Sequence, residues 1–281
     1  MGGKINAASK KALALVNACH PIPCLAVASF AGLFSIGVGI AWDRSLLIFF
    51  VVLLQQISVG LSNDWLDYKK DVMAGRNDKP AVRGTVKVSE LRAVAIAAAL
   101  LAQGTSFIFG PTAALVMFGM LVAGWAYNLG MKSNWTSVIP YAVGFGLIPI
   151  FIGLASAEPF WAQAWVVLVA ALLGVSAHFA NVLPDIEADK LTGVNSLPHI
   201  LGQKFSAIAI AITALAATVL VVTQSANLDA LVATIGLVSN VVIVGLASLF
   251  SLRKEPPRSA FMLLILASLV NVVLLMLGSG S

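Results

Sequence analysis

Charge is the property that this sequence has least of. Only 10% of its 281 residues are charged, whereas 59% are hydrophobic, and its mean hydropathy is +0.96. Soluble domains carry about 25% charged residues, so the composition excludes the one or two soluble domains that the length alone would allow. The long uncharged runs indicate a chain whose solvent is lipid.

Cysteine is also scarce. Cys19 and Cys24, at the start of the first long apolar segment, are the only two. Two cysteines are too few for a disulfide framework, and we expect both to act as small apolar residues. Residues 1–20 carry three lysines but no small-residue cleavage site before a soluble domain. We expect this segment to be short, amphipathic and on the cytoplasmic surface.

The apolar runs predict an all-α integral membrane protein with one domain over residues 1–281. We expect a bundle of about nine transmembrane helices around a central cavity, because each run is near the length that crosses a bilayer core. Frequent Gly, Ala and Ser inside the runs suit close helix packing in lipid. The expected spans are roughly 21–41, 45–63, 93–110, 112–130, 136–156, 160–182, 205–224, 229–251 and 259–278.

Basic residues are distributed on one side of this predicted topology. Every Lys and Arg except Arg44 falls in the N-terminal segment or after the second, fourth, sixth or eighth span. Basic loops stay in the cytoplasm, so we expect the N-terminus there, in a prokaryotic plasma membrane. The net charge of +5 then follows from the basic residues that fix the topology, and these residues face anionic lipid headgroups. Nothing in the sequence indicates nucleic acid as a partner.

The few charges are concentrated in one segment, residues 63–84. Its sequence NDWLDYKKDVMAGRNDKPAVRG holds four acids and five bases, directly after the second apolar run. Concentrated polarity at the end of a membrane helix is costly unless it binds something. This segment is therefore the first candidate for a functional site.

The same pattern returns 118 residues later, in residues 181–202, NVLPDIEADKLTGVNSLPHILG. Seven of the 22 ungapped positions are identical, far more than the shared composition would give. The identical pairs are Asn63 and Asn181, Asp67 and Asp185, Asp71 and Asp189, Gly75 and Gly193, Asn77 and Asn195, Pro80 and Pro198, and Gly84 and Gly202. Internal symmetry of this kind in a membrane protein predicts a site between two halves.

The repeated polar positions predict two rows of oxygen ligands. Residues at i, i+4 and i+8 of a helix face one way, so Asn63, Asp67 and Asp71 would form one row. Asn181, Asp185 and Asp189 would form the second row, and Asp64 adds a carboxylate to the first. Carboxylates that converge on one cavity repel each other without cations, and oxygen ligation without His or Cys favours Mg²⁺ completed by phosphate and water. These seven residues are the predicted metal ligands.

Basic residues that follow the first row suit the outer oxygens of a diphosphate. Arg76, Lys79 and Arg83 lie within 12 residues of Asp71. The alternative interpretation is that charged loops only mark the cytoplasmic face. That interpretation would suffice for a single DxxD motif. Two copies in register, each at the end of a membrane helix, favour a binding site.

The motifs resemble the paired signatures of the UbiA superfamily of intramembrane prenyltransferases. NDxxDxxxD in the first half and DxxxD in the second carry the resemblance, and NDWLDYKKD and NVLPDIEADK are similar to the menaquinone and 4-hydroxybenzoate branches. The resemblance covers nearly the whole chain. It implies Mg²⁺-dependent transfer of an isoprenoid chain from a polyprenyl diphosphate to a lipophilic acceptor, expected to be an aromatic quinone precursor, with release of pyrophosphate inside the membrane.

The resemblance also implies roles for individual residues. Asp67, Asp71, Asp185 and Asp189 are expected to be catalytic, and the expected diphosphate contacts are Asn63, Lys79, Arg83, Tyr127, Lys132, Asn181 and Lys190. An aromatic belt with a topogenic lysine explains Tyr127 and Lys132 equally well. Relatives carry Arg-Pro near His20-Pro21, but we expect His20 to be an interfacial residue outside the site. His178 is expected to be hydrogen-bonded within the bundle.

Three other functions are alternatives to prenyl transfer onto a quinone precursor, and a fourth is excluded. A related terpene cyclase would use the same donor and metals but need no acceptor, and a carotenoid or lipid prenyltransferase would differ only in the acceptor. A CDP-alcohol phosphotransferase is excluded because the chain has no DGxxAR followed by GxxxDxxxD. A transporter of a phosphorylated or divalent substrate would not release pyrophosphate.

Overall fold

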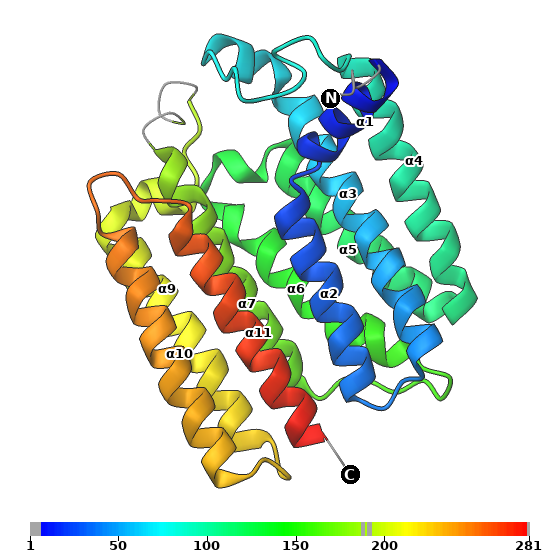
Figure 1. The fold of residues 1–281 in the computed structure, drawn as a ribbon, viewed down its shortest axis with the longest axis vertical. Coiled ribbons are helices and arrows are strands. Elements are labelled where there is room, and N and C mark those ends of the chain that lie inside the picture. The colour runs from blue at the N-terminus through cyan, green and yellow to red at the C-terminus, as the bar shows by residue number, and fades with distance from the viewer. Residues whose placement is uncertain (1–6, 187–188, 190–192, 280–281) are drawn as a thin grey trace, which may run out of the picture.

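The computed structural model describes residues 7–186, 189 and 193–279 (Figure 1). All regular structure in these residues is helical, which confirms the predicted all-α class. The long helices are α1 (Ala7–Ala18), α2 (Pro21–Gly37), α3 (Trp42–Met73), α4 (Val88–Ser106), α5 (Pro111–Leu129), α6 (Val138–Leu154), α7 (Ala164–Val182), α9 (Leu197–Gln224), α10 (Ala230–Ser251) and α11 (Ser259–Ser279). Short 3₁₀ turns are η1 (Phe107–Phe109), η2 (Met131–Ser133), η3 (Trp135–Ser137) and η4 (Leu183–Asp185).

The membrane-crossing helices match the predicted spans closely. In the described part of the chain, eight helices are long and apolar enough to cross a bilayer. A ninth span is counted when 9–18 and α2, which meet at a bend of 68°, are taken together. The 17 residues of α2 alone rise only about 25 Å, less than the roughly 30 Å core.

Helix α3 is the largest departure from the predicted boundaries. The second span was expected at 45–63, but α3 continues to Met73 and is 32 residues long. Hydropathy detects only the lipid-facing part of a helix, whereas its backbone hydrogen bonds continue into the polar segment. Asn63, Asp67 and Asp71 therefore lie on the last turns of one helix, as predicted.

The second row is built differently from the first. Asn181 lies in α7, but that helix ends at Val182 and Asp185 belongs to the 3₁₀ turn η4. Pro184 has no N–H and cannot donate to the preceding turn. The prediction of a second row on one regular α-helix is therefore wrong, although the backbone dihedral angles of Val182, Leu183 and Ile186 remain right-handed helical.

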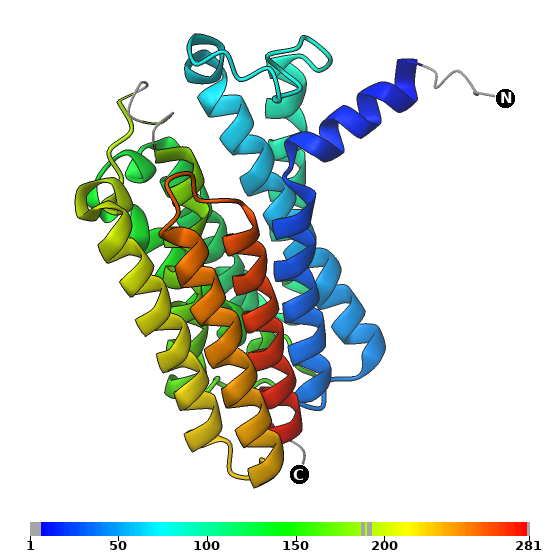
Figure 2. The same ribbon diagram turned by 60° about the vertical axis from the view of Figure 1, so that its left-hand side comes forward.

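The helices pack in chain order around a ring. Each long helix from α2 to α10 contacts the next, and α11 packs against both α10 and α2 and so closes the ring. Figure 1 places α1, the loops before α4 and α11, and the described part of the loop before α9 at one end, with the last turn of α11 at the other. In Figure 2, α1 extends away from the bundle at the first of these ends. This end is called the polar end below.

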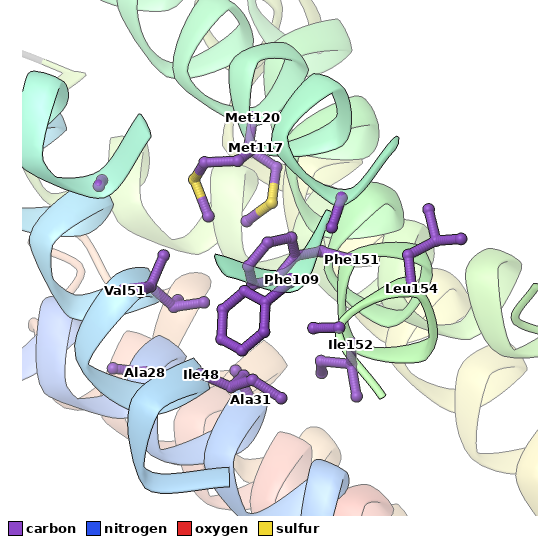
Figure 3. Packing of buried hydrophobic residues seen from close by; sticks show 14 of the residues in the cluster. Ala28, Ala31, Ile48, Val51, Phe109, Met117, Met120, Phe151, Ile152 and Leu154 are labelled. Carbon is purple, nitrogen blue, oxygen red and sulfur yellow. The ribbon is translucent and has the colours of Figure 1, made fainter. Parts of the chain in front are cut away.

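An apolar cluster fills the bundle near the end of α4 (Figure 3). The rings of Phe109 and Phe151 meet edge to face with centroids 5.8 Å apart. Met117 and Met120 lie beside them, and all four side chains are buried. Aromatic and thioether groups pack well at such junctions. The cluster packs α4, α5 and α6 together. The polar groups of the site lie outside it, at the polar end.

The internal repeat is visible in the backbone. Gly75 and Gly193 have φ angles of 66° and 73°, and Gly84 and Gly202 have 72° and 78°. Residues with a side chain rarely adopt this left-handed conformation. Both pairs are among the identities found in the sequence, so the two segments share local geometry as well as residue types.

Candidate active site

One cavity of about 560 Å³ opens from the polar end into the bundle. Helices α2, α3, α5, α6, α7 and α11 supply its walls. Nine predicted site residues line it: Asn63, Asp67, Asp71, Lys79, Tyr127, Lys132, Asn181, Asp185 and Asp189. The two rows, 118 positions apart in the sequence, thus meet across a single space.

The central carboxylate of each row is paired with a base. Lys132 of η2 donates to Asp67, and both side chains are largely buried. On the other side, Arg258 Nη2 donates to Asp185 at 3.1 and 3.3 Å from its two oxygens. The partner of Asp185 is a residue that the sequence did not indicate, because nothing local distinguishes Arg258 from other loop cations.

Asn128 of α5 fixes the start of the first row. Its Nδ2 donates to the Val59 carbonyl and to Ser62 Oγ, both at 2.8 Å, and its Oδ1 accepts from Asn63 Nδ2 at 3.1 Å. These bonds tie α5 to α3 where close approach is possible. Gly124 allows it, since a Cβ there would lie 2.4 Å from a Val59 methyl group. The amide of Asn63 is thereby oriented.

Asp64 lies apart from the cavity lining. Its side chain is 2% exposed, and its Oδ1 accepts from Lys79 and lies 3.0 Å from His20 Nε2. Its Oδ2 has no hydrogen-bond partner among the described residues. The predicted ligand therefore sits behind the first row in a buried ion pair, which holds Lys79 at the edge of the cavity.

His20 belongs to this site, although the sequence placed it outside. It lines the cavity and lies 3.3 Å from Lys79 Nζ. Its φ of 56° is left-handed, where a residue with a side chain is strained. The sequence held one signal for this placement, since His20-Pro21 lies near the position where relatives carry Arg-Pro.

Burial shifts the pKa values of two charged groups that line the cavity. Burial, followed by the charge of Asp185, raises the pKa of Asp189 to about 6 from its ordinary 3.8. Burial lowers the pKa of Lys132 despite the attraction of Asp67. His199 Nε2 lies 3.6 Å from Asp189 Oδ2. A divalent cation would relieve the repulsion between these carboxylates.

Below the charged groups the cavity is aromatic. Tyr127 and Tyr141 meet edge to face at 5.2 Å, and Phe145 stacks on Tyr141 at 6.1 Å. Asn181 donates to the Tyr141 hydroxyl at 3.4 Å. His178 is fully buried and its Nε2 lies 3.0 Å from Ser137 Oγ, so it is held within the bundle as expected.

The donor set fits Mg²⁺ as a partly protein-bound ion. No three His, Cys, Asp or Glu side chains in the described ranges are grouped closely enough to hold a metal alone. The six residues of the two rows instead offer only carboxylate and amide oxygens to one cavity. Mg²⁺ binds through one or two carboxylates and completes its shell with phosphate and water.

Besides Asp64, two predicted residues are not placed in the cavity. Arg83 is exposed and does not belong to the cavity lining, and Lys190 lies outside the described residues. Two further basic residues line the cavity, Lys70 and Arg76. Arg76 is paired with Asp78 through two contacts of 3.0 Å, and that pairing raises its pKa.

Comparison with known proteins agrees with this architecture. Digeranylgeranylglyceryl phosphate synthase of Thermococcus sibiricus is 29% identical over 66% of this chain and 68% of its own length. The bacteriochlorophyll synthase 33 kDa chain of Cereibacter sphaeroides is 27% identical over 64% of this chain and 63% of its own length. A UbiA homolog from Archaeoglobus fulgidus, solved bound to GPP and Mg²⁺, shares the fold with a TM-score of 0.73 at 16% identity, over 94% of this chain and 98% of the other.

The family assignment rests on a match that covers most of the chain. Residues 22–274, from the start of α2 almost to the end of α11, match the UbiA prenyltransferase family. The matched range includes both polar rows and the cavity between them. This multi-pass membrane protein is therefore an enzyme of the UbiA prenyltransferase family.

Proposed function

We propose that the protein transfers an isoprenoid chain from a polyprenyl diphosphate to the aromatic ring of a lipophilic quinone precursor within the membrane. The observation that carries this proposal is the single cavity, where two rows of oxygen ligands and several basic side chains meet above an aromatic and apolar wall. The polar part suits a diphosphate and the apolar part suits its hydrocarbon tail. On the basic-loop argument, we place this end in the cytoplasm.

The rows Asn63, Asp67, Asp71 and Asn181, Asp185, Asp189 are the residues that would hold Mg²⁺. The relative from Archaeoglobus fulgidus binds GPP together with Mg²⁺, which supports the same pairing of donor and metal here. When bound, Mg²⁺ supplies Lewis-acid stabilisation of the charge that develops on the leaving diphosphate. Asp64 supports the first row by holding Lys79.

Basic residues hold the departing pyrophosphate. Lys132 and Lys79 line the cavity and face carboxylates in the free protein. Lys132 can donate to phosphate oxygens once Asp67 has a metal partner, and Lys79 can donate the N–H groups that do not bond Asp64. Charge-assisted hydrogen bonds of this kind to phosphate are strong. Arg83 and Lys190 remain predicted diphosphate contacts.

The aromatic wall serves the hydrocarbon side of the reaction. As the allylic C–O bond breaks, positive charge develops on the prenyl carbon, and the faces of Tyr127, Tyr141 and Phe145 are suited to stabilise it. The surrounding apolar side chains exclude water, which would otherwise capture the cation as an alcohol. A carbon of the acceptor ring then attacks and loses its proton.

A second acceptor class is favoured by one of the comparisons. The relative with 29% identity is named digeranylgeranylglyceryl phosphate synthase, which points to a glyceryl phosphate lipid as the acceptor. The same cavity and metal chemistry would serve, and only the nucleophile would change from a ring carbon to a hydroxyl oxygen. Both candidates therefore belong in one acceptor panel.

The test is turnover with defined substrates. Purified protein with Mg²⁺ and labelled geranyl to decaprenyl diphosphates should release pyrophosphate and prenylate one acceptor of the panel, as identified by mass. Asp67→Ala and Asp185→Ala should abolish turnover while the protein stays folded. A terpene cyclase would release pyrophosphate without acceptor, a transporter would release none, and full activity in either variant would remove the metal assignment.

A further inference from the structure

Each acidic row is met by one basic side chain from a loop in the same relative position. Starting from α3, which carries the first row, the chain passes through α4 and α5 before it reaches Lys132. Starting from α7, it passes through α9 and α10 before it reaches Arg258. Lys132 bonds Asp67 and Arg258 bonds Asp185. The two bases are thus equivalent in topology.

The carboxylates that they bond are also equivalent. Asp67 and Asp185 occupy the same position of the 118-residue repeat. The turns that follow the rows confirm that register: the N–H of Arg76 donates to the Asp71 carbonyl at 2.9 Å, and the N–H of Val194 donates to the Asp189 carbonyl at 3.1 Å. Sequence alignment and backbone geometry give the same pairing.

We propose that Arg258 is a diphosphate-binding residue, the second-half counterpart of Lys132. This inference rests on the proposed function. In the free protein the guanidinium of Arg258 is paired with Asp185. If a metal ion engaged Asp185, the guanidinium would be free to exchange its carboxylate partner for the oxygens of a diphosphate bound beside it. The exchange forms and breaks no covalent bond.

The position of Arg258 suits this exchange. Its side chain is 62% exposed and lines the cavity at the start of α11. Among the cavity-lining residues that the structure describes from α6 onward, Arg258 is the only Lys or Arg. A diphosphate between the two rows therefore meets this side chain on its second-half face. The planar guanidinium can present two parallel N–H groups to phosphate in a fixed fork, whereas the lysine ammonium acts as a point charge.

A simpler role has to be separated from this one. Exposed ion pairs contribute little to stability, and the bond to Asp185 could be no more than that. If Arg258 binds diphosphate, its removal should affect the binding of Mg²⁺ alone and the binding of pyrophosphate with Mg²⁺ in opposite directions. If Arg258 is only structural, its removal should not separate the two affinities in this way. Removing Arg258 frees Asp185 of a competing cation, so Mg²⁺ alone should bind as tightly or more tightly. Pyrophosphate in the presence of Mg²⁺ should bind less tightly.

The experiment is calorimetric titration of the full-length protein in lipid nanodiscs. Wild type, Arg258→Gln, Arg258→Lys and the matched loop control Lys254→Gln are titrated with Mg²⁺, then with pyrophosphate at saturating Mg²⁺. Lys254 is exposed and does not line the cavity. We expect Arg258→Gln to weaken pyrophosphate binding about tenfold, Arg258→Lys to weaken it about threefold, and Lys254→Gln to leave it unchanged.

The outcomes distinguish this inference from the function on which it rests. The role of Arg258 would be overturned, with the proposed function left intact, by either of two results. One is a pyrophosphate affinity in Arg258→Gln equal to that of wild type, and the other is an equal loss of pyrophosphate affinity in Arg258→Gln and Lys254→Gln. A parallel loss of Mg²⁺ affinity would show a structural role instead. Should Arg258→Gln not fold, an unchanged pyrophosphate affinity in Arg258→Lys would overturn the inference. Failure of wild-type protein to bind pyrophosphate with Mg²⁺ would contradict the proposed function itself.

Discussion

Replacing Asn128 by alanine should weaken both the fold and the proposed Mg²⁺ site. The Asn128 side chain is 5% exposed and makes three hydrogen bonds to α3: two as donor, to Val59 and Ser62, and one as acceptor, from Asn63. Hydrogen bonds between transmembrane helices average about 0.6 kcal/mol each. Asn128→Ala should therefore lower the free energy of unfolding by about 2 kcal/mol.

A buried asparagine elsewhere gives the matched control. Asn240 of α10 is fully buried and donates one hydrogen bond, to Thr218 Oγ1 at 3.0 Å. Asn240→Ala removes the same atoms but fewer bonds, so its loss should be under about 1 kcal/mol. Unfolding in mixed micelles, followed with increasing SDS, measures both values.

The Mg²⁺ dependence of activity separates an effect on the Asn63 side chain from a general loss of stability. Without Asn128 the amide of Asn63 loses the partner that orients it, and lost support of a metal ligand costs about 10- to 100-fold in metal affinity. The Mg²⁺ concentration for half-maximal turnover should therefore rise at least about tenfold in Asn128→Ala and stay unchanged in Asn240→Ala. Equal destabilisation by the two variants, or a normal Mg²⁺ requirement in Asn128→Ala, would refute this reasoning.

Two further predictions concern packing and pH. A Cβ at Gly60 would lie 2.3 Å from the Cys19 carbonyl oxygen, so Gly60→Ala should cost about 1–3 kcal/mol, visible in thermal unfolding. Gly245→Ala, with no described atom within 4 Å of the added Cβ, should not, and equal Tm values would contradict the packing argument. The pKa of Asp189 is raised to about 6 by burial and by Asp185. Because proton and metal compete for one carboxylate, Mg²⁺ affinity measured by calorimetry should fall about tenfold per pH unit below that value. An acid at its ordinary pKa would leave the affinity flat from about pH 5 upward, and a flat profile would count against Asp189 as a ligand.

The sequence predicted the helical bundle because lipid burial dominates the chain. Long apolar runs leave little choice of secondary structure, and most span boundaries were located within a few residues, the end of α3 and the start of α9 excepted. The end of α3 was missed, since hydropathy falls at Asn63 while the helix continues to Met73. The 3₁₀ turn at Asp185 was also missed, although Pro184 was a local signal for it.

The site was predictable only where it repeats. The paired rows stood out because the same polar positions recur at one spacing. The bases that face them did not, since their contacts are made in three dimensions: Arg258 is 73 positions from Asp185. His20 is likewise 44 positions from Asp64. No local pattern carries such pairings, and charge in a loop has many explanations.

Because the two polar rows belong to different halves of the ring, a ligand bound between them should stabilise the folded protein. Helix α3 carries the first row, whereas the second row begins on α7 and continues through η4 to Asp189. A molecule bound in the cavity would therefore contact both halves of the ring at once. A ligand that binds only the folded protein raises the free energy of unfolding, by about 2.7 kcal/mol when its concentration is a hundredfold above Kd. Cells rich in isoprenoid donor would thus keep this enzyme longer than cells starved of it.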